Sequence, residues 1–327
     1  MPLHIQPPPG AAVEIHRQVP IRLERATVVV GLINNMPDSA LEGTEVQFKR
    51  LLAAASGERV VRLCLASMPE VPRGPEARAM IADLYWSLEQ LWAQAPDAII
   101  VTGTEPKTAA LSDEPYWQRL VELIEYADAN LISSVWSCLA AHAAVLHLDG
   151  IARKRLAAKR FGVFEQRVTL EDALTKELGA EIRIPHSRWN SLPADVLSAA
   201  NYRVLTQSVA GDADMFIKRR RSLLVFFQGH PEYEVRTLLK EYQRDVGRFI
   251  SGEYQEYPQV PVGYFNPEAL TLVREFERRL RAGELAHPLA AFPFRALAAS
   301  IQAAWLAPAE QIYRNWLSLI ISRKSAT

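Results

Sequence analysis

The chain has 327 residues with 37 lysines and arginines and 37 aspartates and glutamates, so its formal net charge is zero, and 49% of its residues are apolar. This balance is typical of a globular protein and argues against nucleic acid or an anionic membrane as the main partner, because both usually select a basic excess. Only two cysteines occur, Cys64 and Cys138, outside any CxxC pattern. Neither a disulfide framework nor a thiolate zinc site is therefore expected.

The first residues predict neither a secretion signal nor a membrane anchor. Residues 1–25 lack a basic segment followed by an apolar one, and nowhere do 18 apolar residues follow one another. The run PPPG at residues 7–10 favours a loosely held, extended N-terminal arm over residues 1–25. We expect a cytoplasmic protein that binds no membrane.

From residue 26, short β-rich runs alternate with longer helical patterns. Strands are predicted at 26–34, 60–67, 97–103 and 130–137, and helices at 45–55, 81–95 and 116–128. Continuous apolar strands separated by helices indicate an α/β fold, with a mostly parallel sheet flanked by helices. Because the crossovers are right-handed, the carboxyl ends of the strands share one edge, where ligands bind.

The pattern changes after Gly150. Strands with some antiparallel pairing are predicted at 161–170, 181–188, 202–208, 213–220 and 222–230. Helices follow at 234–250, 267–282, 293–305 and 309–322. We expect one α/β catalytic domain over 26–255 and a C-terminal helical extension, 256–327, packed on the same unit. The apolar helices of the extension leave room for a homodimer interface.

Cys138 lies where the fourth predicted strand ends and a helix begins. A residue on such a turn projects from the carboxyl edge of the sheet, and the helix N-terminus there favours a thiolate and binds an oxyanion. Position alone does not exclude the alternative of a buried, inert cysteine. His142, four residues on, shares a helix face with Cys138; it competes as a base unless it packs beneath the turn.

The segment GHPE at residues 229–232 ends a strongly apolar strand. Residues two apart in extended backbone face the same side, so Glu232 is placed to orient His230. A histidine held by a carboxylate is the base that thiol activation requires, whereas the alternative is a surface histidine beside an acid. The order Cys138, His230, Glu232 favours a catalytic triad.

The sequence predicts no metal site and no permanently bound cofactor. His142 and His147 are five residues apart, which is not the helical spacing of metal ligands, and no acidic cluster joins them. Neither the dinucleotide pattern GxGxxG nor the nucleotide pattern GxxxxGK[ST] occurs.

Nine segments, read in order, resemble the homoserine O-acyltransferases of the MetA type, whose flavodoxin-like fold is related to class I glutamine amidotransferases. Besides the Cys138 turn, they are INNMP (33–37), TEVQF (44–48), VTG (101–103) with YW (116–117), KRFGVFE (159–165), PHSR (185–188), GHPEY (229–233), VGYF (262–265) and YRNWL (313–317). Each match is short, but the ordered set covers residues 30 to 318.

The resemblance implies a ping-pong transfer of an acyl group from acyl-CoA, as co-substrate, to the hydroxyl of L-homoserine in methionine biosynthesis. Cys138 would carry the acyl group as a thioester. His230, oriented by Glu232, would then activate the acceptor hydroxyl. The backbone N–H groups of Asn35 and Leu139 would form the oxyanion hole.

The resemblance also assigns substrate contacts, by position, to Lys159, Ser187 and Arg244, and Glu241 joins them. An amino-acid acceptor offers one ammonium and one carboxylate, which an acid and an arginine bind. Glu241 and Arg244 are three residues apart on a predicted helix and share a face. Without the resemblance, an ordinary surface ion pair is an equal alternative for these two residues.

The chain departs from the family pattern at two places. The turn reads CLAAH (138–142) where the family commonly has CWGAQ, which leaves open whether homoserine or a related hydroxy-amino acid is the acceptor. At the position of acyl choice, acetyl-using members carry glutamate and succinyl-using members glycine, whereas this chain has Lys107. Because a cation pairs with the free carboxylate of a succinyl group, we expect succinyl-CoA rather than acetyl-CoA.

Two other functions fit the same fold. A glutamine amidotransferase-type hydrolase uses a similar triad, but such modules usually have glycines around the cysteine and a synthetase partner or domain. The second is a non-catalytic binding protein, which would not need to retain Cys138, His230 and Glu232 together.

Overall fold

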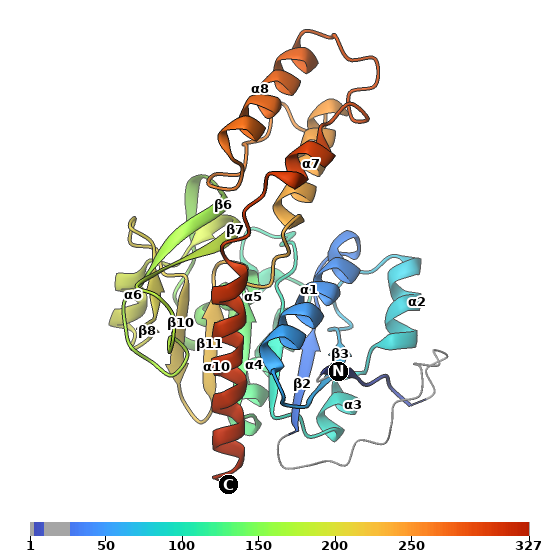
Figure 1. The fold of residues 1–327 in the computed structure, drawn as a ribbon. Helices are drawn as coiled ribbons and strands as arrows, with labels where there is room; N and C mark the ends of the chain where they lie inside the picture. The colour runs from blue at the N-terminus through green and yellow to red at the C-terminus, as the bar shows by residue number, and fades with distance from the viewer. Residues whose placement is uncertain (1–2, 10–26, 327) are drawn as a thin grey trace.

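The computed structural model describes residues 3–9 and 27–326, and its centre is a twisted eight-stranded sheet (Figure 1). Across the sheet the strands are β1 (Leu3–Ile5), β3 (Val61–Ala66), β2 (Val28–Ile33), β4 (Ala98–Val101), β5 (Ser133–Ser137), β11 (Leu223–Phe227), β10 (Met215–Arg219) and β8 (Arg203–Val204). The first six are parallel, and β10 runs antiparallel to both of its neighbours. The predicted α/β fold with a mostly parallel sheet is confirmed.

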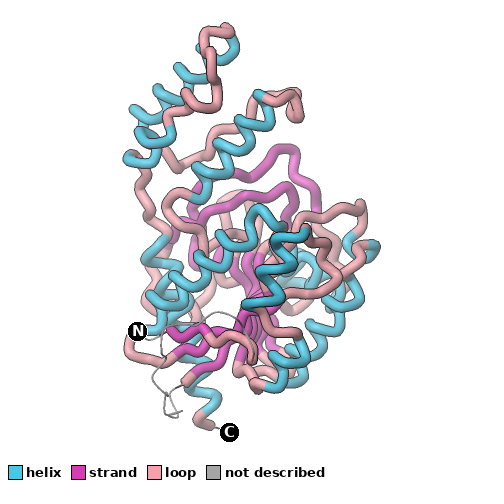
Figure 2. Tube along the Cα trace, turned by 90° about the vertical axis from the view of Figure 1, so that its right-hand side faces the viewer, coloured by secondary structure: helices cyan, strands magenta, loops and turns pink. Residues whose placement is uncertain are grey.

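Helices cover both faces of this sheet, which is seen nearly edge-on in Figure 2. On one face lie α1 (Asp38–Ser56), α2 (Pro75–Leu84) and α10 (Leu306–Lys324), and on the other α3 (Leu88–Ala93), α4 (Trp117–Asn130), α5 (Leu139–Asp149) and α6 (Ala194–Ala199). Successive residues of β2 alternate between the two layers: Val28 and Val30 pack with α1, and Val29 packs on the opposite side. Burial on both faces explains why the strands read as continuous apolar runs.

A second, antiparallel sheet contains β7 (Glu181–Ser191), β6 (Lys154–Val168) and β9 (Thr206–Gln207). Beyond it, at the top of Figure 1, lie α7 (Thr237–Ile250) and α8 (Pro267–Arg281), with α9 (Phe294–Ala299) packed against them. An apolar cluster that includes Phe161, Tyr242 and Trp305 joins these helices to β6. The antiparallel pairing predicted after Gly150 is confirmed.

The single helix predicted at 81–95 is wrong, because the chain forms α2 and α3 with a break between them. Trp86 in the break forms an isolated bridge with Ala66, so the backbone there continues the edge of β3. Ser87 then starts α3: its side chain accepts from the N–H of Gln90, whose side chain accepts from the N–H of Ser87. This capping box restarts the helix after the extended residues.

Both ends of the described chain contact the central sheet. At the N-terminus, β1 pairs with β3, and Trp86 Nε1 donates to the carbonyl of Gln6 at 2.6 Å. The rest of the predicted arm, residues 1–2 and 10–25, lies outside the described residues. At the C-terminus, Trp316 of α10 is buried and its Nε1 donates to Ser133 Oγ at 2.9 Å. Among the described residues, no helix combines the length and apolarity needed to span a bilayer.

Candidate active site

Cys138 occupies the sharp turn between β5 and α5, at the carboxyl edge of the sheet. Its φ of 52° lies in the left-handed region, which residues other than glycine rarely adopt, and its N–H donates to the carbonyl of Phe227 at 2.7 Å. The side chain is partly exposed. Strain of this kind, held by a neighbouring strand, is typical of a functional position.

His230 and Glu232 follow β11, the strand next to β5, and reach the same place. His230 Nδ1 lies 2.8 Å from Glu232 Oε1, and the imidazole interacts with the Cys138 side chain. Burial alone would lower the pKa of His230, but the negative charge of Glu232 and the interaction with the Cys138 side chain raise it well above its usual value. The raised pKa favours the imidazolium form of His230 beside the Cys138 sulfur.

The competing base, His142, packs beneath the turn instead. It is buried, and its Nε2 lies 3.0 Å from Gln228 Oε1. Burial lowers the pKa of His142 to about 3, so the ring is neutral. The other cysteine, Cys64, lies in the core of β3, where burial raises the pKa of its thiol to about 11. Neither residue competes with the Cys138–His230 pair.

His142 gives a pH-dependent stability that can be measured. Its pKa is about 3 in the folded protein and 6.5 ordinarily. The stabilisation by neutral His142 is therefore complete above pH 6.5 and is lost as the pH falls toward 3. When the pH is lowered from 7.5 to 5, the unfolding free energy of the wild type should fall, and that of His142→Gln should fall by about 2 kcal/mol less, as measured by urea denaturation. Glutamine keeps a donor for Gln228 but does not titrate.

The matched control is His147→Gln, on the same helix, where the histidine Nε2 contacts Glu125 at 2.7 Å and is partly exposed. That variant should retain the wild-type loss between the two pH values. Equal pH dependence in His142→Gln and wild type would show that His142 is not held neutral in the fold.

The two N–H groups expected in the oxyanion hole differ in the structure. Leu139 is the first residue of α5, so its N–H has no acceptor within the helix. The N–H of Asn35, by contrast, donates to Thr102 Oγ1 at 2.8 Å. Asn35 takes part in an oxyanion hole only if this bond opens, and its role stays a prediction.

Gly103 lies very close to Leu139, the residue that follows Cys138. The family commonly has a glycine two residues after the cysteine, where this chain has buried Ala140. A Cβ on Gly103 would lie 2.7 Å from Leu139 Cβ and 3.0 Å from Leu139 N. The small residue beside the nucleophile is therefore Gly103, which follows the carboxyl end of the neighbouring parallel strand β4.

Glu241 of α7 connects the predicted acceptor residues to the triad. Its carboxylate accepts from Ser187 Oγ and from the hydroxyl of Tyr233, each at 2.6 Å. The ring of Tyr233 stacks on His230 with the centroids 4.4 Å apart. Tyr233 was not singled out from the sequence, although it directly follows the GHPE segment.

Arg244 and Lys159 share a partner that the sequence analysis missed. Arg244 Nε and Nη2 bind Asp245 Oδ1 at 3.0 and 2.9 Å, and Lys159 Nζ lies 3.3 Å from Asp245 Oδ2. Arg244 is therefore paired with Asp245 and not with Glu241. The four-residue spacing of Glu241 and Asp245 along α7 was the available signal. Glu241 thus offers a carboxylate for an ammonium group, and Arg244 and Lys159 offer cations for a carboxylate.

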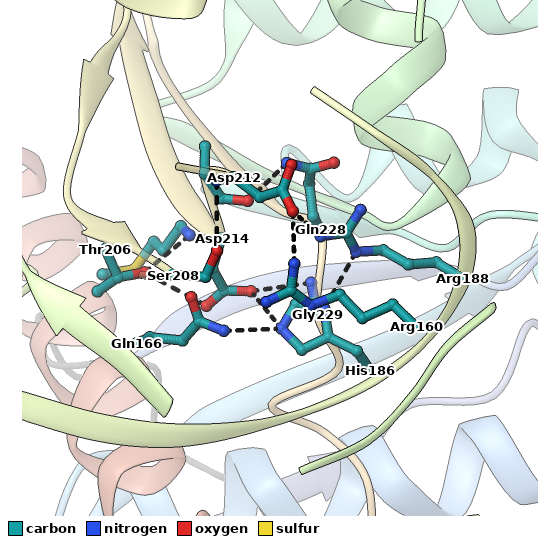
Figure 3. Close-up of polar contacts among 12 residues, drawn as sticks. Arg160, Gln166, His186, Arg188, Thr206, Ser208, Asp212, Asp214, Gln228 and Gly229 are labelled. Atoms are coloured by element: carbon teal, nitrogen blue, oxygen red, sulfur yellow. Dashed lines mark hydrogen bonds and ion pairs between the residues drawn. The ribbon is translucent and has the colours of Figure 1, made fainter. Parts of the chain in front are cut away.

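A buried polar network around Asp214 and His186 contacts Gly229, the residue before His230 (Figure 3). Asp214 Oδ1 accepts from the N–H of Gly229 at 3.0 Å and lies 3.4 Å from His186 Nε2. Burial raises the pKa of Asp214 to about 6. A Cβ on Gly229 would lie 2.6 Å from Asp214 Oδ1, so only glycine fits here. The network fixes the backbone immediately before His230.

Comparisons with known proteins show the family of the chain. The family model of homoserine O-succinyltransferase matches residues 13–327. The chain belongs to the homoserine O-succinyltransferase family. A relative of that name from Rhodopseudomonas palustris is 44% identical over 95% of this chain and 94% of its own length. One from Methylorubrum extorquens is 43% identical over 90% and 87%. The family and enzyme class expected from the sequence are confirmed.

Solved structures show the same fold. A glutamine amidotransferase from Thermotoga maritima aligns with a TM-score of 0.51 at 14% identity, covering 90% of this chain and 98% of its own. Another, from Methylobacillus flagellatus, aligns with a TM-score of 0.50 at 16% identity, covering 90% and 95%. At such identities the likeness shows the fold alone, and it confirms the glutamine amidotransferase-like architecture.

Lys107, the residue expected from the sequence to influence acyl choice, lies in the loop between β4 and α4 and is exposed, and its role stays a prediction. The loop is held by buried Glu114, whose Oε1 accepts from the N–H groups of Lys107 and Thr108 at 2.6 and 2.7 Å. In the part of the chain that the structure describes, no cluster of histidine, cysteine and carboxylate side chains forms a metal site.

Proposed function

We propose that this member of the family transfers a succinyl group from succinyl-CoA to the hydroxyl of L-homoserine, in methionine biosynthesis, through a thioester on Cys138. The observation that carries the proposal is the contact of His230 with both Glu232 and Cys138. It supplies a nucleophile, a base and a group that orients the base. The identities of the transferred group and of the acceptor are taken from the names of the relatives.

In the first half-reaction, the Cys138 sulfur attacks the thioester carbonyl carbon of the donor. The resulting oxyanion is stabilised by the N–H of Leu139 and the positive end of α5. The tetrahedral intermediate collapses, the bond to the CoA sulfur breaks, and the imidazolium of His230 protonates the leaving thiolate. The acyl group then remains on Cys138 and His230 is neutral.

In the second half-reaction, neutral His230 removes the proton from the acceptor hydroxyl, whose oxygen attacks the thioester on Cys138. Collapse of the second intermediate releases the succinyl ester and restores thiolate and imidazolium. Glu241 binds the acceptor ammonium, and Arg244 with Lys159 binds its carboxylate. Ser187, which donates to Glu241, contacts the acceptor next to that carboxylate.

The test is intact-protein mass spectrometry after mixing with succinyl-CoA in the absence of an acceptor. We expect the mass of one succinyl group, mapped by peptide analysis to Cys138, and its disappearance when homoserine is added. Cys64→Ala, which changes the buried core cysteine, should keep the adduct. No adduct with either succinyl-CoA or acetyl-CoA would contradict the proposal, and release of ammonia from glutamine would favour the hydrolase instead.

A further inference from the structure

A large cavity lies at the carboxyl end of β3, on the same edge of the sheet as Cys138. It has a volume of about 790 Å³ and is bordered by the residues after β3, by α2, by the start of α3 and by Arg119 of α4. We call it the β3 cavity. The described residues that line it include Met68, Tyr85 and Trp86, but no member of the triad or of the predicted acceptor site.

The charged side chains of the β3 cavity are mostly cations. Among the described residues that line it, Arg73, Arg78 and Arg119 are cations and Glu89 is the single acid. Arg119 already pairs with Glu70, whose Oε1 lies 3.1 Å from its Nε, whereas exposed Arg78 donates to the carbonyl of Arg73. A cavity of this size with a surplus of arginines suits an anionic ligand.

Arg73 keeps a buried donor that has no acceptor. Its side chain is only 5% exposed, and its terminal nitrogens donate to the carbonyls of Asn34 and Met36 and to the Asp38 carboxylate. The Nε–H, by contrast, makes no hydrogen bond among the described residues. Because buried polar groups are nearly always paired, this donor indicates that a ligand supplies an acceptor oxygen in the cavity.

A second, small cavity lies between the β3 cavity and the nucleophile. It is lined by Met68, which also lines the β3 cavity, by Gly103 after β4 and by Leu139, the residue after Cys138. In the sheet order β3, β2, β4, β5, three inter-strand spacings, or about 14 Å, separate the ends of β3 and β5. A ligand held in the β3 cavity therefore reaches Cys138 through a thin arm of about this length.

The donor of the proposed reaction has such a shape. In CoA a pantetheine arm joins the sulfur to an adenosine nucleotide that carries three phosphate groups. From the sulfur to the first phosphate, the arm has as many backbone bonds as about four amino-acid residues, so it spans about 14 Å when extended. The anionic nucleotide matches the arginines of the β3 cavity, and its adenine ring matches the apolar part of the lining.

Another cavity of similar size is electrically balanced. Its volume is about 740 Å³, and it borders the Glu232 side of the triad. Its charged lining residues, three cations and three acids, are Arg50, Arg236, Lys240, Glu232, Glu234 and Glu310. The acids repel phosphate groups, so a nucleotide gains less there than in the β3 cavity.

We propose that the β3 cavity binds the adenosine nucleotide of the CoA donor, with Arg73, Arg78 and Arg119 in contact with its phosphate groups. The pantetheine arm runs from there past Met68 to Cys138. This inference rests on the proposed function. It places the donor on the β3 side of the nucleophile, whereas the acceptor residues of β7 and α7 lie on the β11 side.

The test compares succinyl-CoA with succinyl-pantetheine, which lacks the nucleotide, at saturating homoserine. In Arg78→Ala the KM for succinyl-CoA is expected to rise about 5- to 10-fold at unchanged kcat, and both constants for succinyl-pantetheine to stay within about twofold. Arg78→Lys keeps the charge and should retain most of the affinity. Arg78 is the residue to change because Arg73 also holds the backbone after β2.

The matched control is Arg236→Ala, in the balanced cavity, which should leave the KM of both donors unchanged. If Arg236→Ala weakens succinyl-CoA and Arg78→Ala does not, the nucleotide binds in the other cavity and the inference is wrong. An equal rise of KM for both donors in Arg78→Ala would also overturn it.

A binding measurement separates this inference from the proposed function. If the wild type forms no adduct on Cys138 with either donor, the proposed function fails. If the adduct forms, but calorimetry shows that Arg78→Ala binds CoA as tightly as the wild type, only the assignment of the β3 cavity fails.

Discussion

Glu232→Gln is expected to lower kcat for acyl transfer by about 10³- to 10⁴-fold without unfolding the protein. Glu232 Oε1 lies 2.8 Å from His230 Nδ1, so the carboxylate accepts the Nδ1–H proton and leaves Nε2 free for proton transfer. An amide at this position can donate to Nδ1 and stabilise the wrong tautomer. It also removes a charge that raises the pKa of His230.

The measurement is single-turnover kinetics with succinyl-CoA, followed by homoserine. Both half-reactions should slow, because His230 transfers a proton in each of them. The control is Glu234→Gln, two residues further along the chain. Glu234 pairs with exposed Arg50, so this variant should retain kcat within about twofold. A Glu232→Gln enzyme within tenfold of wild type would mean that Glu232 does not orient the base.

The positions of the triad residues follow from local sequence signals. Cys138 ends an apolar run and begins a helix, so its place at the sheet edge depends only on its own neighbours. His230 and Glu232 follow β11, the strand that pairs with β5, but they lie in a turn closed by the bond from the N–H of Tyr233 to the carbonyl of His230 at 3.1 Å, and not in the extended backbone from which their pairing was predicted. Such signals survive without knowledge of the tertiary structure, because each is confined to a few residues.

The acceptor residues were predicted individually, but not the contacts between them. Ser187 and Glu241 are 54 residues apart in the chain, and their hydrogen bond depends on how α7 packs against β7. For the same reason the sequence left a Glu241–Arg244 ion pair as an equal alternative, whereas Arg244 binds its neighbour Asp245. Helical spacing shows which residues share a face; the rotamers and the opposing element decide which of them bond.

Charge pairing was the least predictable feature. The sequence shows both Arg153 and Arg160, but nothing local distinguishes them. In the structure Arg160 pairs with Asp212, whereas Arg153 has no such acid among the described residues. An unpaired cation is a property of the whole fold, because every nearby element must fail to supply an acid.

The fold was predictable where burial is two-sided and less so at its breaks and ends. The apolar strands β2 to β5 are continuous runs because both sheet faces are covered. The break between α2 and α3 was missed because apolar residues continue through it, while its actual signal is the Ser87–Gln90 capping box. The position of α10 against β5 depends on the contact of Trp316 with Ser133, which joins distant parts of the chain.

The second large effect is expected for the acceptor. Glu241→Gln should lower kcat/KM for homoserine by about 10²-fold and leave the rate of succinyl adduct formation unchanged within about twofold. Glutamine keeps an oxygen that accepts from Ser187 or Tyr233, so the ring stacked on His230 stays in place. What it loses is the negative charge opposite the acceptor ammonium.

A ping-pong mechanism makes this split informative, because the donor step precedes acceptor binding. Pre-steady-state adduct formation and steady-state transfer would be measured on the same preparation. A slower donor step in Glu241→Gln would mean that Glu241 acts through Tyr233 on His230 and not on the acceptor. Asp245→Asn provides the complementary comparison: Asp245 holds Arg244 and Lys159, so this variant perturbs the carboxylate side of the acceptor site. Weaker acceptor binding in both variants, with the donor step intact, would place the ammonium and the carboxylate of the acceptor on opposite ends of the same α7 surface.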